Sequence, residues 1–366
     1  MKTIGSVKED LSTERRVSIT PETVKKYVDL NFSVFLEKKY GEHLGIFDDE
    51  YKKNGASLHD TAEEVLKKSE VLLKVNCSSN DQVDLLREKS ILIGQFDLLA
   101  NKETINRLIK RDIKIFSLNL LPRITRAQSM DVLSSQANLA GYRAVIESVE
   151  EFDKAIPMMM TAAGTITPAK VMVVGAGVAG LQAIATAKRL GAIVSATDVR
   201  PTAKEQVESL GGKFLSVDST DNFESKDGYA KEASEEYKKK QSVLLKKAAS
   251  NSDIIICTAL VPGKKAPRII TEDIVKSMSP GSIIYDLAVE QGGNSAYSIA
   301  DKIEIINGVK IMGLKNILNK IPLTASKLYS KNLFSFVNNL LNKDKDKINI
   351  NREDEIILKT LLDKEI

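Results

Sequence analysis

Short apolar runs alternate with amphipathic segments along the first third of the chain. Runs with the pattern of buried strands occupy residues 3–9, 33–39, 71–76, 91–96 and 113–119. Segments with apolar residues at helical spacing separate them. This alternation predicts an α/β domain with a parallel sheet, because parallel strands need a crossover connection, usually a helix.

The pattern changes after Pro122 and then repeats. Residues 128–150 carry apolar positions at helical spacing and are expected to form a connecting helix. A second series of strand patterns follows, at residues 171–176, 192–198, 213–217, 253–259, 282–288 and, more weakly, 309–314. The chain is therefore expected to be α/β, with two Rossmann-like domains that each contain a parallel sheet, and with a cleft between them.

Three segments depart from this rhythm. Residues 219–241 are rich in polar, charged and glycine residues before a helical pattern resumes, and a loop of that length is usually functional or disordered. The apolar run at residues 157–160 is expected to be core rather than contact surface. The charged residues from 342 onward are expected to form one short element.

Composition narrows the classes of function. The 366 residues are 43% hydrophobic, enough for two domains with full cores. A net charge of +4 spread over the whole length gives no concentrated basic field, so no nucleic-acid partner is expected. Two histidines and two cysteines without ligand spacing lead us to expect no metal site. No apolar run approaches the ~18 residues that span a bilayer.

The glycine pattern between residues 171 and 189 carries the clearest chemistry. Gly175, Gly177 and Gly180 fit G-x-G-x-x-G between a strand pattern and a helical pattern. The first glycine would form the tight turn, the second would let a pyrophosphate approach the backbone, and the third would let helix and strand pack closely. The pyrophosphate would then lie at the helix N-terminus. The alternative is a structural glycine turn without a ligand.

An acidic residue stands where a dinucleotide site requires one. Asp198 ends the next strand pattern, where a carboxylate accepts hydrogen bonds from ribose hydroxyls and repels a 2′-phosphate. This position favours NAD over NADP. Arg200 could suit a phosphate, and we interpret it as a solvated neighbour of the acid.

An acid/base group is harder to find. Oxidation of an alcohol or amine moves a proton as well as a hydride, and histidine is the usual carrier. Neither His43 nor His59 ends a strand pattern, and both are expected to be surface or packing residues. Lys74 ends a strand pattern in the first domain, where it would either face the interdomain cleft or lie at the sheet edge with its head group in water.

Several segments together carry a family resemblance. They are RRVSITPE (15–22), RITRAQSMDVLSSQANLAGYRAV (123–145), TAAGTITPAKVMVVGAGVAGLQAIATAKRLGA (161–192), DGYAKE (227–232), TALVPGKKAP (258–267) and DLAVEQGGN (286–294). Over nearly its whole length the chain resembles the NAD(H)-binding component of the proton-translocating NAD(P) transhydrogenases. It is similar, more distantly, to alanine dehydrogenases, whose catalytic histidine falls in the segment where this chain has Gln95. Lys74 remains, and Glu290 stands where the dehydrogenases have an acid.

The transhydrogenase resemblance implies a reaction that needs no acid/base group. Hydride would pass directly between the C4 atoms of NADH on this chain and NADP⁺ on a partner domain, so catalysis would reduce to positioning. By the family pattern Arg123, Asp131 and Ser134 would hold the carboxamide and ribose of the nicotinamide, and Gln128 would reach the nicotinamide ribose of the partner's nucleotide. The alternative for this set is a polar helix N-terminus capped by Ser and Asp side chains.

The resemblance also implies the cofactor contacts and the domain limits. A loop around Gly228, Tyr229 and Ala230 would close over bound nucleotide. The expected NAD(H) contacts are Gly175, Gly177, Val178, Ala179, Gly180, Asp198, Val199, Arg200, Gly228, Tyr229, Ala259 and Leu260. Residues 1–127 and 325–366 would form an alanine-dehydrogenase-like domain, and 128–324 the NAD(H)-binding domain.

The same resemblance implies partners. The chain would form a homodimer, dock an NADP(H)-binding subunit or domain, and associate through a membrane-spanning subunit with the cytoplasmic face of a membrane. Two other hypotheses stay open, an alanine-dehydrogenase-like oxidoreductase and a non-catalytic NAD-binding regulatory module.

Overall fold

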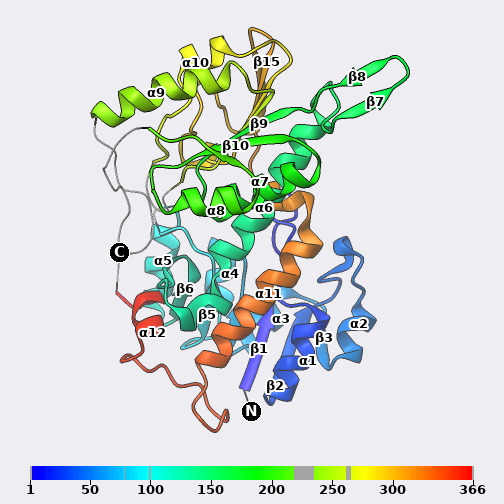
Figure 1. Ribbon diagram of the computed structural model, residues 1–366. Helices are drawn as coiled ribbons and strands as arrows, with labels where there is room; N and C mark the ends of the chain where they lie inside the picture. The colour runs from blue at the N-terminus through cyan, green and yellow to red at the C-terminus, as the bar shows by residue number, and fades with distance from the viewer. Residues whose placement is uncertain (1, 78, 99, 218–234, 261–264, 365–366) are drawn as a thin grey trace. The chain divides into compact units, whose positions relative to one another are not determined.

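The computed structural model describes residues 2–77, 79–98, 100–217, 235–260 and 265–364 (Figure 1). Contacts between Cα atoms divide the chain into two compact units: unit 1 contains Met1–Gln136 with Leu318–Ile366, and unit 2 contains Ala137–Ile317. The limits expected from the sequence, at 127/128 and 324/325, stay a prediction about folding domains, because compactness alone does not test which segments fold independently.

Unit 1 is built on a seven-stranded sheet in the order β16-β6-β5-β4-β1-β2-β3. Its strands are β1 (Lys2–Ser6), β2 (Phe32–Glu37), β3 (Ala56–His59), β4 (Val71–Leu73), β5 (Ile91–Gly94), β6 (Lys114–Ser117) and β16 (Leu361–Leu362). Neighbouring strands are parallel except for β16, which runs antiparallel to β6. The helices are α1 (Pro21–Asp29), η1 (Glu42–Leu44), α2 (Asp48–Lys53), α3 (Ala62–Lys68), α4 (Asn80–Leu85), α5 (Lys102–Lys110), η2 (Leu118–Leu120), η3 (Thr125–Met130), α11 (Pro322–Asn339) and α12 (Glu355–Thr360).

Both faces of this sheet are buried. Val71 and Leu73 of β4 face a core that α1 and α11 cover, with Tyr27 of α1 packed edge-on against Phe334 of α11. Leu72 points to a second core, which α3 and α5 cover. Burial on two faces explains why β4 reads as a continuous apolar run rather than an alternating one.

Unit 2 contains a second seven-stranded sheet, in the order β11-β10-β9-β12-β13-β15-β14. Its strands are β9 (Lys170–Val174), β10 (Ile193–Thr197), β11 (Lys213–Phe214), β12 (Ile254–Cys257), β13 (Ile283–Asp286), β14 (Lys302–Ile306) and β15 (Val309–Gly313). Only the β14 and β15 pair is antiparallel among these neighbours. The helices are α7 (Val178–Arg189), α8 (Ala203–Ser209), α9 (Glu235–Ala249), α10 (Glu272–Ser277) and η4 (Val289–Gln291).

Two segments join the units along the chain. Helix α6 (Val132–Glu150) begins in unit 1 and continues into unit 2, and the 3-10 helix η5 (Ile317–Lys320) contains the return. The expected helix over 128–150 is confirmed from Val132 onward, whereas Gln128 lies in η3. The α/β class and the two mainly parallel sheets are also confirmed.

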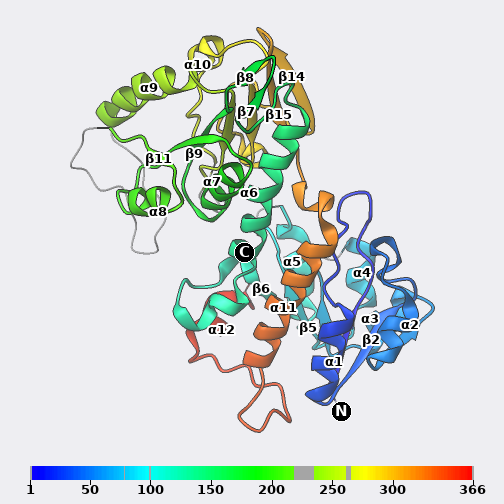
Figure 2. The same cartoon turned by 45° about the vertical axis from the view of Figure 1, so that its right-hand side comes forward.

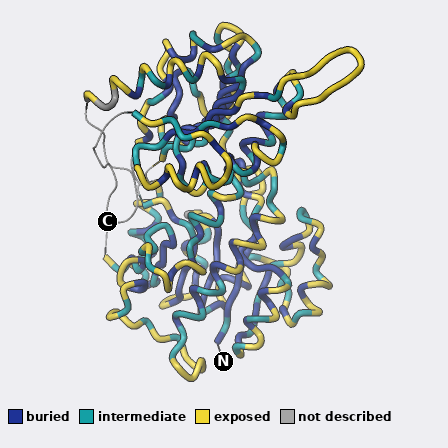
Figure 3. Tube along the Cα trace, viewed as in Figure 1, coloured by how far each residue is buried: buried dark blue, intermediate teal, exposed yellow. Residues whose placement is uncertain are grey.

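A β-hairpin formed by β7 (Met159–Thr161) and β8 (Gly164–Ile166) projects from unit 2 (Figure 1). In the turned view of Figure 2 the same hairpin overlaps the rest of unit 2. All six strand residues are exposed, and the hairpin is the yellow arm of unit 2 in Figure 3. Met158 is 60% and Met160 78% exposed. The expectation that this apolar run belongs to the core is therefore wrong, because the hairpin extends beyond the faces on which it could pack.

Candidate functional site

The three glycines of the sequence motif occupy the turn from β9 into α7, each for a different geometric reason. Gly175 has φ +95°, and a Cβ there would lie 2.9 Å from the Ala259 nitrogen. A Cβ on Gly180 would lie 1.9 Å from the Gly175 oxygen, so only glycine lets α7 approach the loop. A Cβ on Gly177 would meet none of the described residues within 4 Å, which leaves space among them beside the backbone for a ligand. This division of roles is the one a pyrophosphate-binding loop requires.

The first turn of α7 offers backbone N–H groups. Gly177 is the N-cap and has no side chain with which to cap this end of the helix. Val178 is 37% exposed and Ala179 follows it in the same turn. A long helix with an uncapped N-terminus favours an anion there, through free donors and the helix dipole. Gly141 of α6 packs directly behind it, since a Cβ there would lie 2.0 Å from the Ala179 oxygen.

Asp198 lies directly after β10 and is joined to the glycine loop. One of its carboxylate oxygens, Oδ2, accepts the Ala176 N–H at 2.7 Å. Arg200 donates from Nε to Oδ1 and from Nη2 to Oδ2, each at 2.9 Å. The side chains of Asp198 and Arg200 are only 6% and 16% exposed, so the interpretation of Arg200 as a solvated neighbour is wrong. Val199, between them, is half-buried.

The loop after β12 completes this edge of unit 2. Thr258 donates its hydroxyl to the Gly175 oxygen at 2.7 Å, and its backbone N–H donates to Val174. Ala259 lies against Gly175, and Leu260 is 38% exposed. In the order β10-β9-β12, the chain adds strands on one side of β9 and then on the other. These loops therefore lie where the strand order reverses, which is where open α/β sheets bind ligands. The predicted contacts Gly228 and Tyr229 lie outside the described residues.

The four residues expected at the nicotinamide belong to unit 1. Arg123 and Gln128 are exposed, the second on η3. Asp131 accepts the Ser134 N–H at 2.9 Å and its hydroxyl at 2.5 Å. Asp131 and Ser134 therefore lie side by side at the start of α6, as helix-capping residues also would.

Neighbouring residues hold η3 in place. Asn332 of α11 donates to the Ser129 oxygen at 2.9 Å and accepts from the Ser135 hydroxyl at 2.7 Å. Arg126 forms two hydrogen bonds to Asp354, which lowers the pKa of that carboxyl to about 2. The segment that carries Gln128 is thus anchored to the C-terminal region of unit 1.

Unit 1 contains a group of buried charged side chains, of which the sequence analysis singled out only Lys74. Lys74 is 2% exposed, and its Nζ lies 3.0 Å from Glu9 Oε2, so the expectation of a head group in water at the sheet edge is wrong. Burial raises the pKa of Glu9. Arg16 donates to Glu14 at 2.7 Å and to Gln95 at 3.3 Å. No local pattern marks Glu9, because its partner Lys74 is distant in sequence.

The remaining candidates, His43, His59 and Glu290, each lie within hydrogen-bond distance of a neighbouring residue. His43 Nε2 lies 2.8 Å from the Arg15 oxygen, and His59 Nδ1 lies 3.0 Å from Glu64 Oε2. Glu290 accepts the Asn316 N–H at 3.2 Å. Within the described ranges, no three His, Cys, Asp or Glu side chains are grouped so as to hold a metal ion. Among the same residues, no helix is both long and apolar enough to cross a bilayer.

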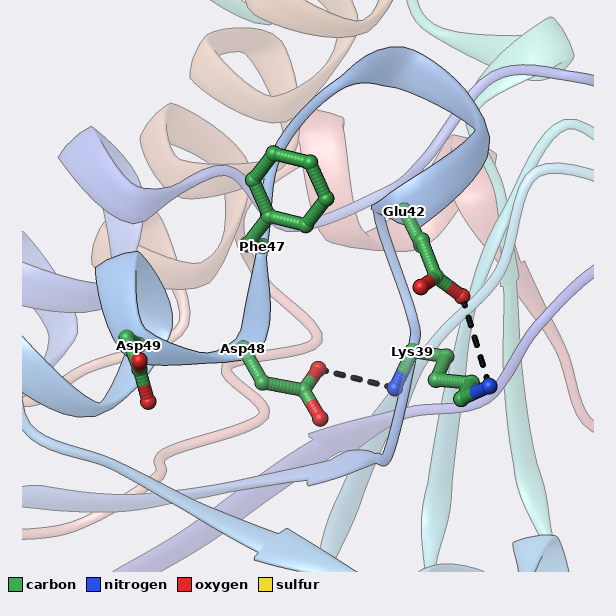
Figure 4. A pocket seen from close by; sticks show the side chains of 5 residues that line it. All are labelled: Lys39, Glu42, Phe47, Asp48 and Asp49. Atoms are coloured by element: carbon green, nitrogen blue, oxygen red, sulfur yellow. Dashed lines mark hydrogen bonds and ion pairs between the residues drawn. The ribbon is translucent and has the colours of Figure 1, made fainter.

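A surface hollow in unit 1 lies away from the predicted residues (Figure 4). It is lined by Lys39, Glu42, Phe47, Asp48 and Asp49, and Asp48 accepts the Lys39 N–H at 2.8 Å. None of the predicted site residues that the structure describes lines it.

Comparison with known proteins gives the family. The N-terminal domain of alanine dehydrogenase/PNT matches residues 5–140, and the C-terminal domain of alanine dehydrogenase/PNT matches residues 144–365. A Rhodospirillum rubrum protein, the first segment of NAD(P) transhydrogenase subunit alpha, is 49% identical over 361 residues, which cover 97% of this chain and 94% of that protein.

Solved structures agree. A transhydrogenase from Sinorhizobium meliloti superimposes with a TM-score of 0.89 at 45% identity and covers 100% of this chain and 99% of its own. An L-alanine dehydrogenase superimposes with a TM-score of 0.82 at 23% identity, covering 98% of this chain and 94% of its own, which supports the fold alone. The resemblance expected from the sequence is confirmed, and the chain belongs to the alanine dehydrogenase/PNT family as a homologue of transhydrogenase alpha subunits.

Proposed function

We propose that this chain is the NAD(H)-binding component of a proton-translocating transhydrogenase, of the Si-specific/Re-specific class. The observation that supports this proposal most strongly is the edge of unit 2, where Gly175, Gly177 and Gly180 leave room for a pyrophosphate beside an uncapped helix N-terminus. The similarity of the chain to transhydrogenase alpha subunits indicates the reaction in which a nucleotide bound at this edge would take part.

Asp198 is proposed to select NAD(H) over NADP(H). Its carboxylate is at the end of β10, within reach of a ribose at the glycine loop. The paired Arg200 offsets part of the charge but holds the carboxylate in place by donating to both of its oxygens. The backbone N–H of Arg200 also donates to Oδ1, so four donors already occupy the carboxylate. A ribose hydroxyl would have to replace one of these donors, whereas a 2′-phosphate would bring a second negative charge up to the carboxylate.

Hydride is proposed to pass directly from NADH to NADP⁺ on a partner domain, without a proton carrier at the site. Arg123, Asp131 and Ser134 would orient the nicotinamide, and Gln128 would reach the second nucleotide. The exposure of Gln128 on η3 leaves its amide available to a docked partner. The replacement of an imidazole by Gln95, itself bonded to Arg16, disfavours an alanine dehydrogenase.

The proposed partners are an NADP(H)-binding subunit or domain, a membrane-spanning subunit and a second copy of this chain. Membrane association, at the cytoplasmic face, would come through the second of these. The hairpin supports self-association, because Lys154 and Lys170 bracket a stretch without any charge. An exposed apolar two-stranded hairpin is marginally stable in water, and burial between two copies would stabilise both at once.

Reconstitution tests the proposal. The chain, loaded with NADH, is mixed with an NADP⁺-binding transhydrogenase domain, and NADPH formation is followed in a single turnover. Transfer that requires both components supports the proposal. Formation of NADH from alanine and NAD⁺ by the chain alone would favour a dehydrogenase, and nucleotide binding without either reaction would favour a regulatory module.

A further inference from the structure

Asn294 is a fully buried side chain that no expected role accounts for. It lies in the segment after β13, with an exposed fraction of 0%. Its oxygen Oδ1 accepts the Ala259 N–H at 3.0 Å. Its nitrogen Nδ2 donates to the Ala259 oxygen at 2.8 Å and to the Pro267 oxygen at 2.9 Å. Both amide hydrogens and the oxygen are therefore used, and an inverted amide would lose all three bonds.

These bonds act on the loop that faces the glycine turn. Asn294 binds both backbone groups of Ala259, as a neighbouring strand would, and it also binds the oxygen of Pro267, eight residues further along the chain. Ala259 in turn lies so near Gly175 that a Cβ added to this glycine would lie 2.9 Å from the Ala259 nitrogen. A displacement of Ala259 would therefore alter the space beside the first glycine.

The segment that carries Asn294 is itself held by hydrogen bonds. Asp286, the last residue of β13, is fully buried and accepts the Ser295 N–H at 2.9 Å and the Ala288 N–H at 3.0 Å. The Asn294 carbonyl also accepts from the backbone of Ile269 and Ile270. The end of β13 is thus connected through Asn294 to the end of β12.

We propose that Asn294 is a positioning residue of the nucleotide site, which holds Ala259 and Leu260 against the nicotinamide half of the bound nucleotide. This inference rests on the proposed function. Strand β10, with Asp198, lies on one side of β9, and β12, with Ala259, lies on the other. A dinucleotide whose adenosine ribose is held at Asp198 crosses the glycine turn, so its second half lies on the β12 side.

The experiment compares NADH with 5′-AMP, which contains only the adenosine monophosphate half of NADH. NADH and 5′-AMP are titrated into the full chain and into the Asn294→Ala variant, well below the melting temperature of each. Loss of the three hydrogen bonds should raise the Kd for NADH about tenfold. The Kd for 5′-AMP, which occupies only the Asp198 side, should change less than about twofold.

Arg268→Ala is the matched control. Arg268 donates to the oxygens of Ser295 and Gly292, in the same segment as Asn294, and these bonds do not involve Ala259. This variant should lower the melting temperature while leaving the Kd for both ligands unchanged. If both variants lose stability but only Asn294→Ala loses NADH affinity, the loss of affinity comes from the position of Ala259 and not from lower stability in general.

A second variant guards against failure of Asn294→Ala to fold. Asn294→Asp keeps an acceptor for the Ala259 N–H, but an ionised carboxylate has no donor for the oxygens of Ala259 and Pro267. The protonated carboxyl can donate to one of them. Its NADH affinity relative to wild type should therefore rise as the pH falls from about 8 to about 5.5.

The outcomes separate this proposal from the function on which it rests. A wild-type chain that binds neither NADH nor 5′-AMP overturns the proposed function and this proposal with it. A wild-type chain that binds both, with equal losses of the two ligands in Asn294→Ala or no loss of NADH, overturns the positioning role of Asn294 alone. A pH-independent NADH affinity ratio in Asn294→Asp also overturns it.

Discussion

The first five strands of each sheet follow the same order, and the edge at their carboxyl ends is filled in opposite ways in the two units. In each unit the chain runs outward from a central strand, β1 or β9, and then crosses to that strand's other side with β4 or β12. At this edge of unit 1, the buried side chains of Glu9 and Lys74 pair with each other. At this edge of unit 2, glycines leave backbone N–H groups beside open space. Topology thus provides two ligand positions, and side chains leave only the second of them open in this way.

The largest effect on stability is expected at the edge of unit 1 that the Glu9 and Lys74 pair fills, the closed edge. Lys74→Met leaves the Glu9 carboxylate buried without its partner and should lower the free energy of unfolding by about 3–5 kcal/mol. NADH affinity should be unchanged in the folded fraction. Urea denaturation and NADH titration of the same variant measure both.

The matched control for Lys74→Met is the double variant with Glu9→Gln. The amide oxygen at position 9 can still accept the Val75 N–H that Glu9 binds at 2.8 Å, so most of the lost stability should return. A double variant as unstable as the single one would mean that the pair is not the cause.

The open edge offers a matched pair of glycines. Gly180→Ala places a Cβ against the Gly175 backbone and should cost about 3 kcal/mol of folding stability along with NADH binding. Gly177→Ala adds a Cβ that meets no atom of the described residues, so stability should fall by under about 1 kcal/mol while NADH binding weakens. Thermal melts and NADH titrations would contradict this account if the two variants lost stability equally.

Gln128→Asn tests the link from binding to transfer. The shorter side chain keeps both its donor and its acceptor, so NADH binding should barely change. Single-turnover transfer to NADP⁺ on the partner domain should fall by about a hundredfold, because a misplacement of about 1 Å is costly when catalysis is orientation. Parallel losses of binding and transfer would indicate that Gln128 contributes only to the local structure of η3.

The smallest effect concerns the anchor of η3. The bonds from Arg126 lower the pKa of Asp354 to about 2 from 3.8, so its contribution to stability is complete above the unfolded value. That contribution is lost as the pH falls through the folded value. Asp354→Asn should cost about 1 kcal/mol near neutral pH, since Arg126 is largely exposed. Urea melts should find that this difference shrinks below about pH 4.

Local patterns predicted the elements on which the open edge rests. Strands β9, β10, β12 and β13 are apolar runs bounded by turn residues, and the glycine spacing follows directly from backbone geometry. Strands β3 and β14 were missed, because Ala56–His59 is short and half exposed and Lys302–Ile306 is an exposed edge with interspersed charge.

Residues that act through distant partners could not be predicted. Glu9 meets Lys74 only once β1 and β4 pair, and Asn294 meets Ala259 only once β12 and β13 pair. The prediction for residues 157–160, which enter the hairpin, is wrong for a different reason. An apolar sequence favours burial, but Met158–Met160 has no surface of its own unit to cover it.

Calorimetric titration of the wild-type chain with NADH and, separately, with NADPH tests the central claim most directly, that the open edge of unit 2 is an NAD(H) site selected by Asp198. We predict one NADH bound per chain, with NADPH at least about tenfold weaker, a difference of roughly 1.4 kcal/mol. Equal affinities for the two nucleotides, or no binding of NADH, would contradict the claim.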